Sequence, residues 1–110
     1  MNPTQRPSVI AIIGGGPRGT GLLERLIANA TELAGGQPIH IHVIDPFPFG
    51  AGRIWRHDQS ELLKMNSMAE DVTMFVDESV QIEGPRELGP TLLEWAEAAE
   101  PSMLRSAELN

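Results

Sequence analysis

The sequence contains no cysteine, which excludes a disulfide framework, a thiolate metal site and a cysteine nucleophile. Long apolar runs are also absent. The longest, Val9 to Ile13, is far shorter than the roughly 18 residues of a membrane span, and no secretory signal is expected from it. We therefore expect a cytoplasmic protein with no membrane partner, since a reducing compartment is compatible with a cysteine-free chain.

Basic residues are scarce in the second half of the chain. Residues 58–110 carry three basic and twelve acidic side chains, whereas residues 1–57 carry five basic and three acidic ones. Non-specific binding to nucleic acid needs a basic face, so a chain of net charge −7 is not expected to bind nucleic acid. The basic residues share their half of the chain with a glycine-rich stretch, which favours a small anionic ligand.

The length of 110 residues allows one domain at most. Its composition, 41% apolar and 21% charged, is that of a globular protein and not of a disordered tail. Residues 1–7 hold two prolines and no periodicity, which predicts a flexible N-terminal arm. Residues 8–110 are expected to form the domain.

Hydrophobic periodicity predicts a strand, a helix and a second strand in the first half of the chain. Val9 to Ile13 is a β-branched run of the kind found in strands buried on both faces. After the glycines of residues 14–19, apolar residues from Leu22 to Ala34 recur at helical spacing. Residues 39–44 predict the second strand. This order is that of a parallel βαβ unit.

The second half of the chain has weaker patterns. Residues 72–76 predict a short strand, and the spacing of Thr91 and Glu94 predicts a capping box that opens a helix through Ala99. A last, weakly indicated helix covers residues 102–109. The expected fold is therefore α/β: the βαβ portion of a Rossmann-like parallel sheet, incomplete, with a helical C-terminal segment.

The clearest functional signal is a G-x-G-x-x-G pattern at Gly14, Gly16 and Gly19. It follows a predicted buried strand and opens an amphipathic helix, which is the context of a dinucleotide-binding site. Gly14 permits a tight turn, Gly16 lets a pyrophosphate approach the backbone, and Gly19 lets the helix pack near the strand. The first helical turn then offers free N–H groups to the phosphates, and Pro17 fits there because it needs no N–H.

An acidic residue and several arginines extend this hypothesis. Asp45 ends the second predicted strand, where its carboxylate would accept hydrogen bonds from the adenosine ribose. Arg18 lies in the first turn of the helix, where a cation is unfavourable unless it meets an anion. Arg53 and Arg56 are candidates for phosphate contacts beside a glycine-containing loop. For all three arginines, a solvated surface position is the alternative.

Other constellations predict no chemistry. His40 and His42 share one face of a strand, but nothing else arrives with ligand spacing, so no metal site is expected. The catalytic residues are unknown at this stage, because no general acid or base stands out and a bound dinucleotide would carry the chemistry.

Several segments together resemble the bacterial FAD/NAD(P)-binding flavoprotein family, which is distantly similar to glutathione-reductase-type and N-hydroxylating monooxygenase domains. The resemblance covers roughly residues 8 to 98. The segments that carry it are Gly14 to Gly19, Leu23 to Leu26, Ile44 to Pro46, Pro48 to Trp55, Leu63 to Asn66 and Gly89 to Trp95.

The resemblance implies FAD as the first dinucleotide and NAD(P)H as a co-substrate. It also implies a flavin-dependent oxidoreductase, with a monooxygenase among the possibilities and an unknown small-molecule substrate. The loop of residues 49–55 and Asn66 would approach the riboflavin half. The expected cofactor-binding residues are Gly14, Gly15, Gly16, Pro17, Arg18, Gly19, Asp45, Pro46, Gly50, Gly52, Arg53, Trp55 and Asn66.

Family members are several times longer and contain further strands and a second nucleotide site. A doubly wound sheet needs about five parallel strands, and a two-stranded sheet is rarely stable alone. The chain is therefore expected to be a truncated part of such a protein, with a missing C-terminal region or a second chain as partner, and turnover by it alone is left open. Two alternatives remain: an NAD-binding dehydrogenase domain without flavin, and a non-catalytic nucleotide-binding or interaction remnant.

Overall fold

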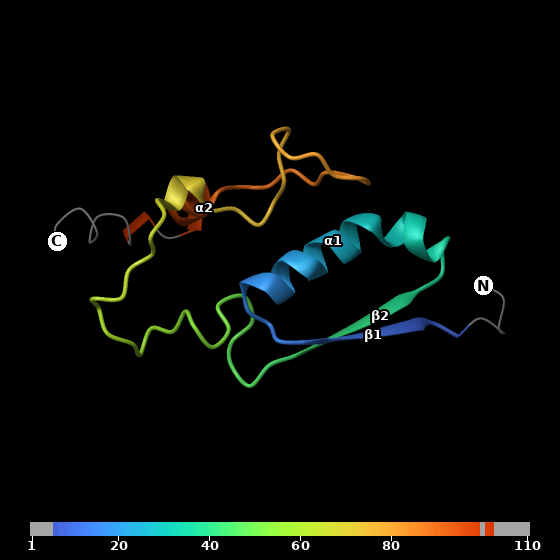
Figure 1. Ribbon diagram of the computed structural model, residues 1–110, viewed down its shortest axis with the longest axis horizontal. Helices are drawn as coiled ribbons and strands as arrows, with labels where there is room; N and C mark the ends of the chain where they lie inside the picture. The colour runs from blue at the N-terminus through green and yellow to red at the C-terminus, as the bar shows by residue number, and fades with distance from the viewer. Residues whose placement is uncertain (1–5, 100, 103–110) are drawn as a thin grey trace. The chain divides into compact units, whose positions relative to one another are not determined.

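The computed structural model describes residues 6–99, 101 and 102, which fall into two compact units (Figure 1). The first unit comprises the described residues up to Gln59 together with Ile82–Pro85, and the second comprises residues 60–81 and the described residues from Arg86 onward. Of the predicted N-terminal arm, residues 1–5 lie outside the described residues.

Two parallel strands form the sheet of the first unit. Strand β1 spans Ser8–Ile13 and strand β2 spans Ile39–Ile44, with Ser8 beside Ile39 and Ile13 beside Ile44. The β-branched side chains of these runs favour the extended conformation. The predicted strands are thus confirmed, β2 at both of its ends and β1 with one additional residue.

Helix α1, Pro17–Ala34, lies along the sheet and contacts both strands (Figure 1). It begins with Pro17, whose fixed backbone suits a first helical position, and it ends at Gly35, which adopts the left-handed conformation typical of a helix terminus. Ile12 is buried, whereas Val9 and Ile13, on the other face of β1, are exposed, so the predicted burial of this strand on both faces is wrong. This β1–α1–β2 unit confirms the predicted Rossmann-like start of an α/β fold.

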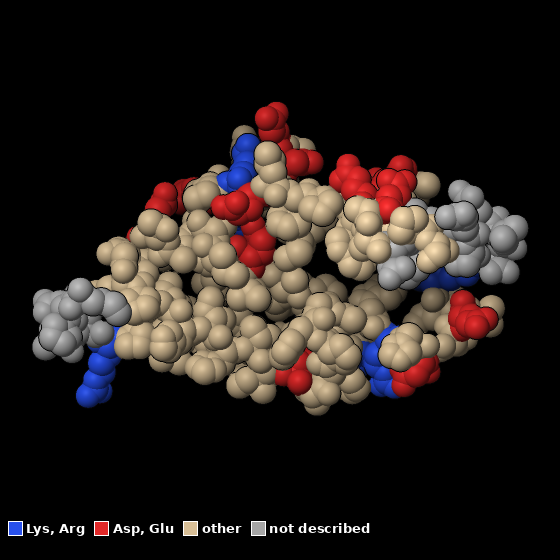
Figure 2. Space-filling view, turned by 180° about the vertical axis from the view of Figure 1, so that it is seen from behind, with Lys and Arg blue, Asp and Glu red and all other residues tan. Residues whose placement is uncertain are grey.

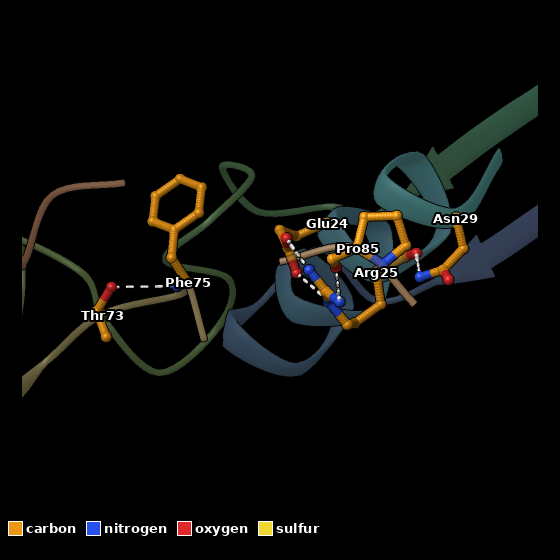
Figure 3. A network of polar contacts seen from close by, with 6 residues as sticks. All are labelled: Glu24, Arg25, Asn29, Thr73, Phe75 and Pro85. Carbon is orange, nitrogen blue, oxygen red and sulfur yellow. Dashed lines mark hydrogen bonds and ion pairs between the residues drawn. The ribbon is translucent and has the colours of Figure 1, made fainter. Parts of the chain in front are cut away.

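A short return segment, Ile82–Pro85, packs on α1 and is called the strap below. The Nη1 of Arg25 donates a hydrogen bond to the carbonyl oxygen of Pro85 at 2.8 Å (Figure 3). The same guanidinium pairs with both carboxylate oxygens of Glu24, at 2.6 and 2.5 Å, and its hydrogen bond lowers the pKa of this buried carboxyl. Gly84 lies against Asn29, so close that a β-carbon at Gly84 would overlap the amide oxygen.

The second unit contains a 3₁₀ turn, η1, at Ala69–Asp71 and helix α2 at Leu92–Ala99. The predicted capping box is present: Thr91 Oγ1 accepts the N–H of Glu94 at 3.2 Å, and Glu94 Oε2 accepts the N–H of Thr91 at 2.9 Å. The backbone N–H of Leu92 donates to the carbonyl of Val72 at 2.8 Å, which ties the start of α2 to the residue that follows η1.

The predicted strand over residues 72–76 is wrong, because this segment forms bends and not a ladder. The hydroxyl of Thr73 accepts the N–H of Phe75 at 3.1 Å (Figure 3). It also donates to the carbonyl of Pro90 at 3.2 Å. A side-chain hydroxyl that forms hydrogen bonds with nearby backbone groups takes the place of the hydrogen bonds that a neighbouring strand would supply.

The helix predicted over residues 102–109 lies, apart from Ser102, outside the described residues. Ser102 itself is helical. Within the described part of the chain, no helix has the length and the apolar character that a membrane crossing requires.

Candidate dinucleotide-binding site

The glycine loop, residues Gly14 to Gly19, connects the end of β1 to the first turn of α1. The N–H of Gly14 donates to the carbonyl of Ile44 at 2.9 Å, which continues the parallel ladder one residue beyond the strand. The backbone of Gly14 has a φ of 108°, a conformation that residues with a side chain rarely adopt. The turn out of the sheet therefore requires glycine at its first position.

The other two motif glycines differ in what the fold demands of them. A β-carbon at Gly19 would overlap the carbonyl oxygen of Gly14, so close packing of the helix on the loop requires glycine there. Gly16 has an ordinary φ of −79°, and the nearest atom to a β-carbon at this position is the Cα of Gly52, at 3.8 Å. Neither backbone strain nor protein packing explains the glycine at position 16.

Asp45, the residue after β2, holds the glycine loop through its carboxylate. Its Oδ2 accepts the N–H of Gly15 at 2.6 Å, and its Oδ1 accepts the N–H of Phe47 at 2.8 Å. These two bonds, that of Gly15 first, lower the pKa of Asp45, so the group is ionised near neutrality. Each carboxylate oxygen retains a second acceptor direction, which leaves the group able to receive a hydroxyl as well.

A second loop, residues 46–52, returns from β2 to the glycine loop. The N–H of Gly50 donates to the carbonyl of Gly15 at 2.6 Å, and the ring of Phe49 lies beside the Cα of Gly15. Gly52 is buried against Gly16. The glycine loop is thus held through both the N–H and the carbonyl of Gly15.

A cavity of about 580 Å³ lies over the glycine loop and the first turn of α1. Its volume is in the range of small-molecule binding sites. The cavity is lined by Ile12, Ile13, Gly14, Gly16, Pro17, Arg18, Gly19, Leu22, Ile54 and Trp55. The N–H groups of Arg18 and Gly19 precede the first backbone bond of the helix, which runs from Thr20 to the carbonyl of Gly16 at 2.9 Å. The positive end of the helix dipole therefore faces this cavity.

Comparison with known sequences shows the family of the chain. The sequence model of the FAD-NAD(P)-binding family matches residues 11–109. The chain belongs to this family. FAD and NAD(P) are therefore the cofactors of the family to which the glycine loop belongs, and the resemblance drawn from the sequence is confirmed.

Three curated relatives of this chain are named for nitrosuccinic acid or for the formation of nitrosuccinate. Nitrosuccinic acid synthase of Aspergillus oryzae is 53% identical over 88 residues, which are 79% of this chain and 14% of that protein. The L-aspartate N-monooxygenases (nitrosuccinate-forming) of Streptomyces davaonensis and Streptomyces cremeus are 47% and 46% identical, over 86% and 83% of this chain. The chain spans only 14% to 15% of the length of these relatives.

Most of the expected site residues lie in the first unit. Pro46, Gly50 and Gly52 belong to the second loop, and Trp55 lines the cavity with 43% of its surface exposed. Arg53 follows this loop and is exposed. Asn66 belongs to the second unit, where its amide oxygen accepts the hydroxyl of Ser67 at 3.4 Å.

Arg56 is engaged away from the glycine loop. Its guanidinium pairs with the Asp58 carboxylate at 2.8 and 2.6 Å and lies over the ring of Phe47, 5.3 Å from the ring centre. The ion pair raises the pKa of Arg56 and lowers that of Asp58. On the face drawn in Figure 2, the described basic side chains stand singly or beside acidic ones.

Two features of the site have no signal in the sequence. Gly15 forms hydrogen bonds with both Asp45 and the second loop, although the G-x-G-x-x-G motif does not specify the residue at this position. A smaller cavity of about 250 Å³ lies on another side of the loop, lined by Gly15, Gly19, Thr20, Leu23, Val43 and Phe49.

In the described part of the chain, no three His, Asp or Glu side chains converge as metal ligands would.

Proposed function

We propose that this chain is the FAD-binding segment of a flavin-dependent N-monooxygenase that uses NAD(P)H as its reductant. The observation that carries the proposal is Gly16. The fold does not require glycine at this position, and the residue lines the cavity at the positive end of α1. A ligand that lies against the backbone explains what the protein's own packing does not.

The residues present fit the diphosphate of such a dinucleotide. Gly14 and Gly16 expose backbone, Arg18 contributes a cation, and the amides of Arg18 and Gly19 lie in the first turn of the helix. Pro17 occupies a position where no N–H is needed. The diphosphate is therefore assigned to the glycine loop, and Asp45, tied to Gly15 at 2.6 Å, is assigned to the adenosine ribose.

The second loop and the residues after it complete the proposed site. Trp55, beside the glycine loop in the cavity, is assigned to the riboflavin half. Pro46, Gly50 and Gly52 shape the second loop, Arg53 is a further candidate for phosphate, and Asn66 is a candidate for the riboflavin half. When bound, FAD supplies the redox chemistry, and the chain's own residues bind and orient the cofactor.

L-Aspartate is the substrate proposed for the whole protein, with oxidation of its amino nitrogen as the reaction. The three relatives, named for nitrosuccinate or its formation from L-aspartate, support this choice. The partners proposed are small molecules and not nucleic acid, in agreement with a net charge of −7. The proposed location is the cytoplasm, with which a cysteine-free chain is compatible.

The test of this proposal is the visible spectrum of the purified protein, mixed with FAD and then desalted. Retained flavin bands at about 370 and 450 nm are expected, because the cofactor's absorption marks the bound flavin. Uptake of NADH without flavin would instead indicate a dehydrogenase domain. A folded protein that retains neither nucleotide would overturn the proposal and leave a non-catalytic remnant.

A further inference from the structure

Gly52 occupies a position that is constrained on two sides. It is buried and its φ is 62°, in the left-handed region that favours glycine. A β-carbon there would lie 2.7 Å from the Cα and 3.1 Å from the backbone nitrogen of Gly16. Both of these atoms belong to the backbone, so no rotation of a side chain would relieve the contact.

Gly52 touches the glycine loop without lining the cavity over it. Gly16 lines that cavity, and Gly52 packs against Gly16. The second loop reaches the same segment in two further ways, through the N–H of Gly50 on the carbonyl of Gly15 at 2.6 Å and through the ring of Phe49 beside Gly15. These contacts fix where the backbone of residues 15 and 16 lies.

We infer that Gly52 is a positioning residue for the diphosphate. By packing against Gly16, it holds the backbone of the glycine loop at the place where the phosphates lie, and it does so without touching them. This inference rests on the proposed function and assigns to the second loop a role that the glycine motif does not contain. A side chain at position 52 pushes Gly16 toward the ligand or separates the two loops.

The experiment compares Gly52→Ala with Gly35→Ala in the full chain. Gly35 ends α1, far along the helix from the glycine loop, and its φ of 56° is close to that of Gly52, but a β-carbon there meets no atom within 4 Å. The control therefore introduces similar backbone strain without the contact to Gly16. Dissociation constants are measured for FAD, ADP and AMP, and thermal unfolding is recorded for each variant.

Gly52→Ala is expected to weaken FAD and ADP at least tenfold and AMP much less, because AMP lacks the second phosphate. Gly35→Ala is expected to leave all three within twofold of the wild type, although both variants unfold at a lower temperature. Unchanged FAD and ADP binding by a folded Gly52→Ala protein would overturn the inference. An equal loss for ADP and AMP would do so as well, because it indicates only a structural defect.

Phe49→Ala provides a second variant should Gly52→Ala fail to fold. It removes the ring from Gly15 without introducing backbone strain, and a several-fold loss of ADP affinity relative to AMP is expected. Equal affinities for wild type and Phe49→Ala would then refute the inference. Failure of the proposed function gives a different result, since the wild-type protein would itself bind no FAD.

Discussion

Replacing Gly16 with alanine should separate cofactor binding from folding. The backbone at Gly16 is extended, with φ −79° and ψ −167°, and the added β-carbon would be 3.8 Å from the nearest protein atom. Because Gly16 precedes α1, the loss of folding stability should be that of a poorer helix cap, about 1 kcal/mol or less. If the diphosphate lies against the backbone of Gly16, as proposed, the added methyl group would occupy part of its place.

The loss of affinity follows from the same steric reasoning. Forcing one additional methyl group into a packed contact costs about 1 to 3 kcal/mol, which corresponds to a dissociation constant about 5- to 160-fold higher. Gly19→Ala is the matched contrast, because its β-carbon would overlap the carbonyl oxygen of Gly14. This variant should lose about 1 to 3 kcal/mol of folding stability in the absence of any ligand.

The assay for both variants combines thermal unfolding without FAD and titration with FAD, followed by flavin fluorescence. The reasoning predicts a nearly wild-type unfolding temperature with weak binding for Gly16→Ala, and a lowered unfolding temperature for Gly19→Ala. It would be refuted by a folded Gly16→Ala protein that binds FAD as the wild type does. A Gly16→Ala protein as unstable as Gly19→Ala would also refute it.

Three further predictions concern single side chains. The hydrogen bond from the Gly15 N–H lowers the pKa of Asp45 in the folded state. The stability that this carboxylate contributes is therefore present above its unfolded pKa of about 3.9 and is lost as pH falls through the lower folded pKa. Asp45→Asn should flatten the acid limb of folding stability measured against pH. Thr91→Ala removes the acceptor for the N–H of Glu94 and should cost about 1 kcal/mol, with Thr91→Ser as the near-neutral control in thermal unfolding. Arg18→Ala should weaken FAD several-fold and reduce the salt dependence of its binding, and an unchanged salt dependence would place this side chain in solvent.

The first half of the fold was predictable because local signals agree there. β-Branched runs, helical spacing of apolar residues and glycine at the helix end each indicate the elements that the structure contains. The capping box at Thr91 was predictable for the same reason, since its two partners are three residues apart. The strand predicted over residues 72–76 does not form, because the Thr73 hydroxyl accepts the N–H of Phe75 and donates to the carbonyl of Pro90.

The contacts that shape the candidate site were not predictable in this way. The hydrogen bonds of Gly15 with Asp45 and Gly50 join positions 30 or more residues apart, and no periodicity in the sequence predicts such a pairing. The strap is a similar case, because the bond from Arg25 to the Pro85 carbonyl spans 60 positions. Sequence patterns thus indicate which residue types can receive a diphosphate, whereas long-range contacts determine how their backbone is held.

The central claim is that the glycine loop offers its backbone amides to the diphosphate of FAD. The most direct test is a titration of the ¹⁵N-labelled protein with FAD, followed by amide resonances in NMR spectra. The largest shifts are expected at the amides of Gly16, Arg18 and Gly19, with smaller shifts at the far end of α1. Bound FAD that leaves these three amides unshifted would contradict the claim.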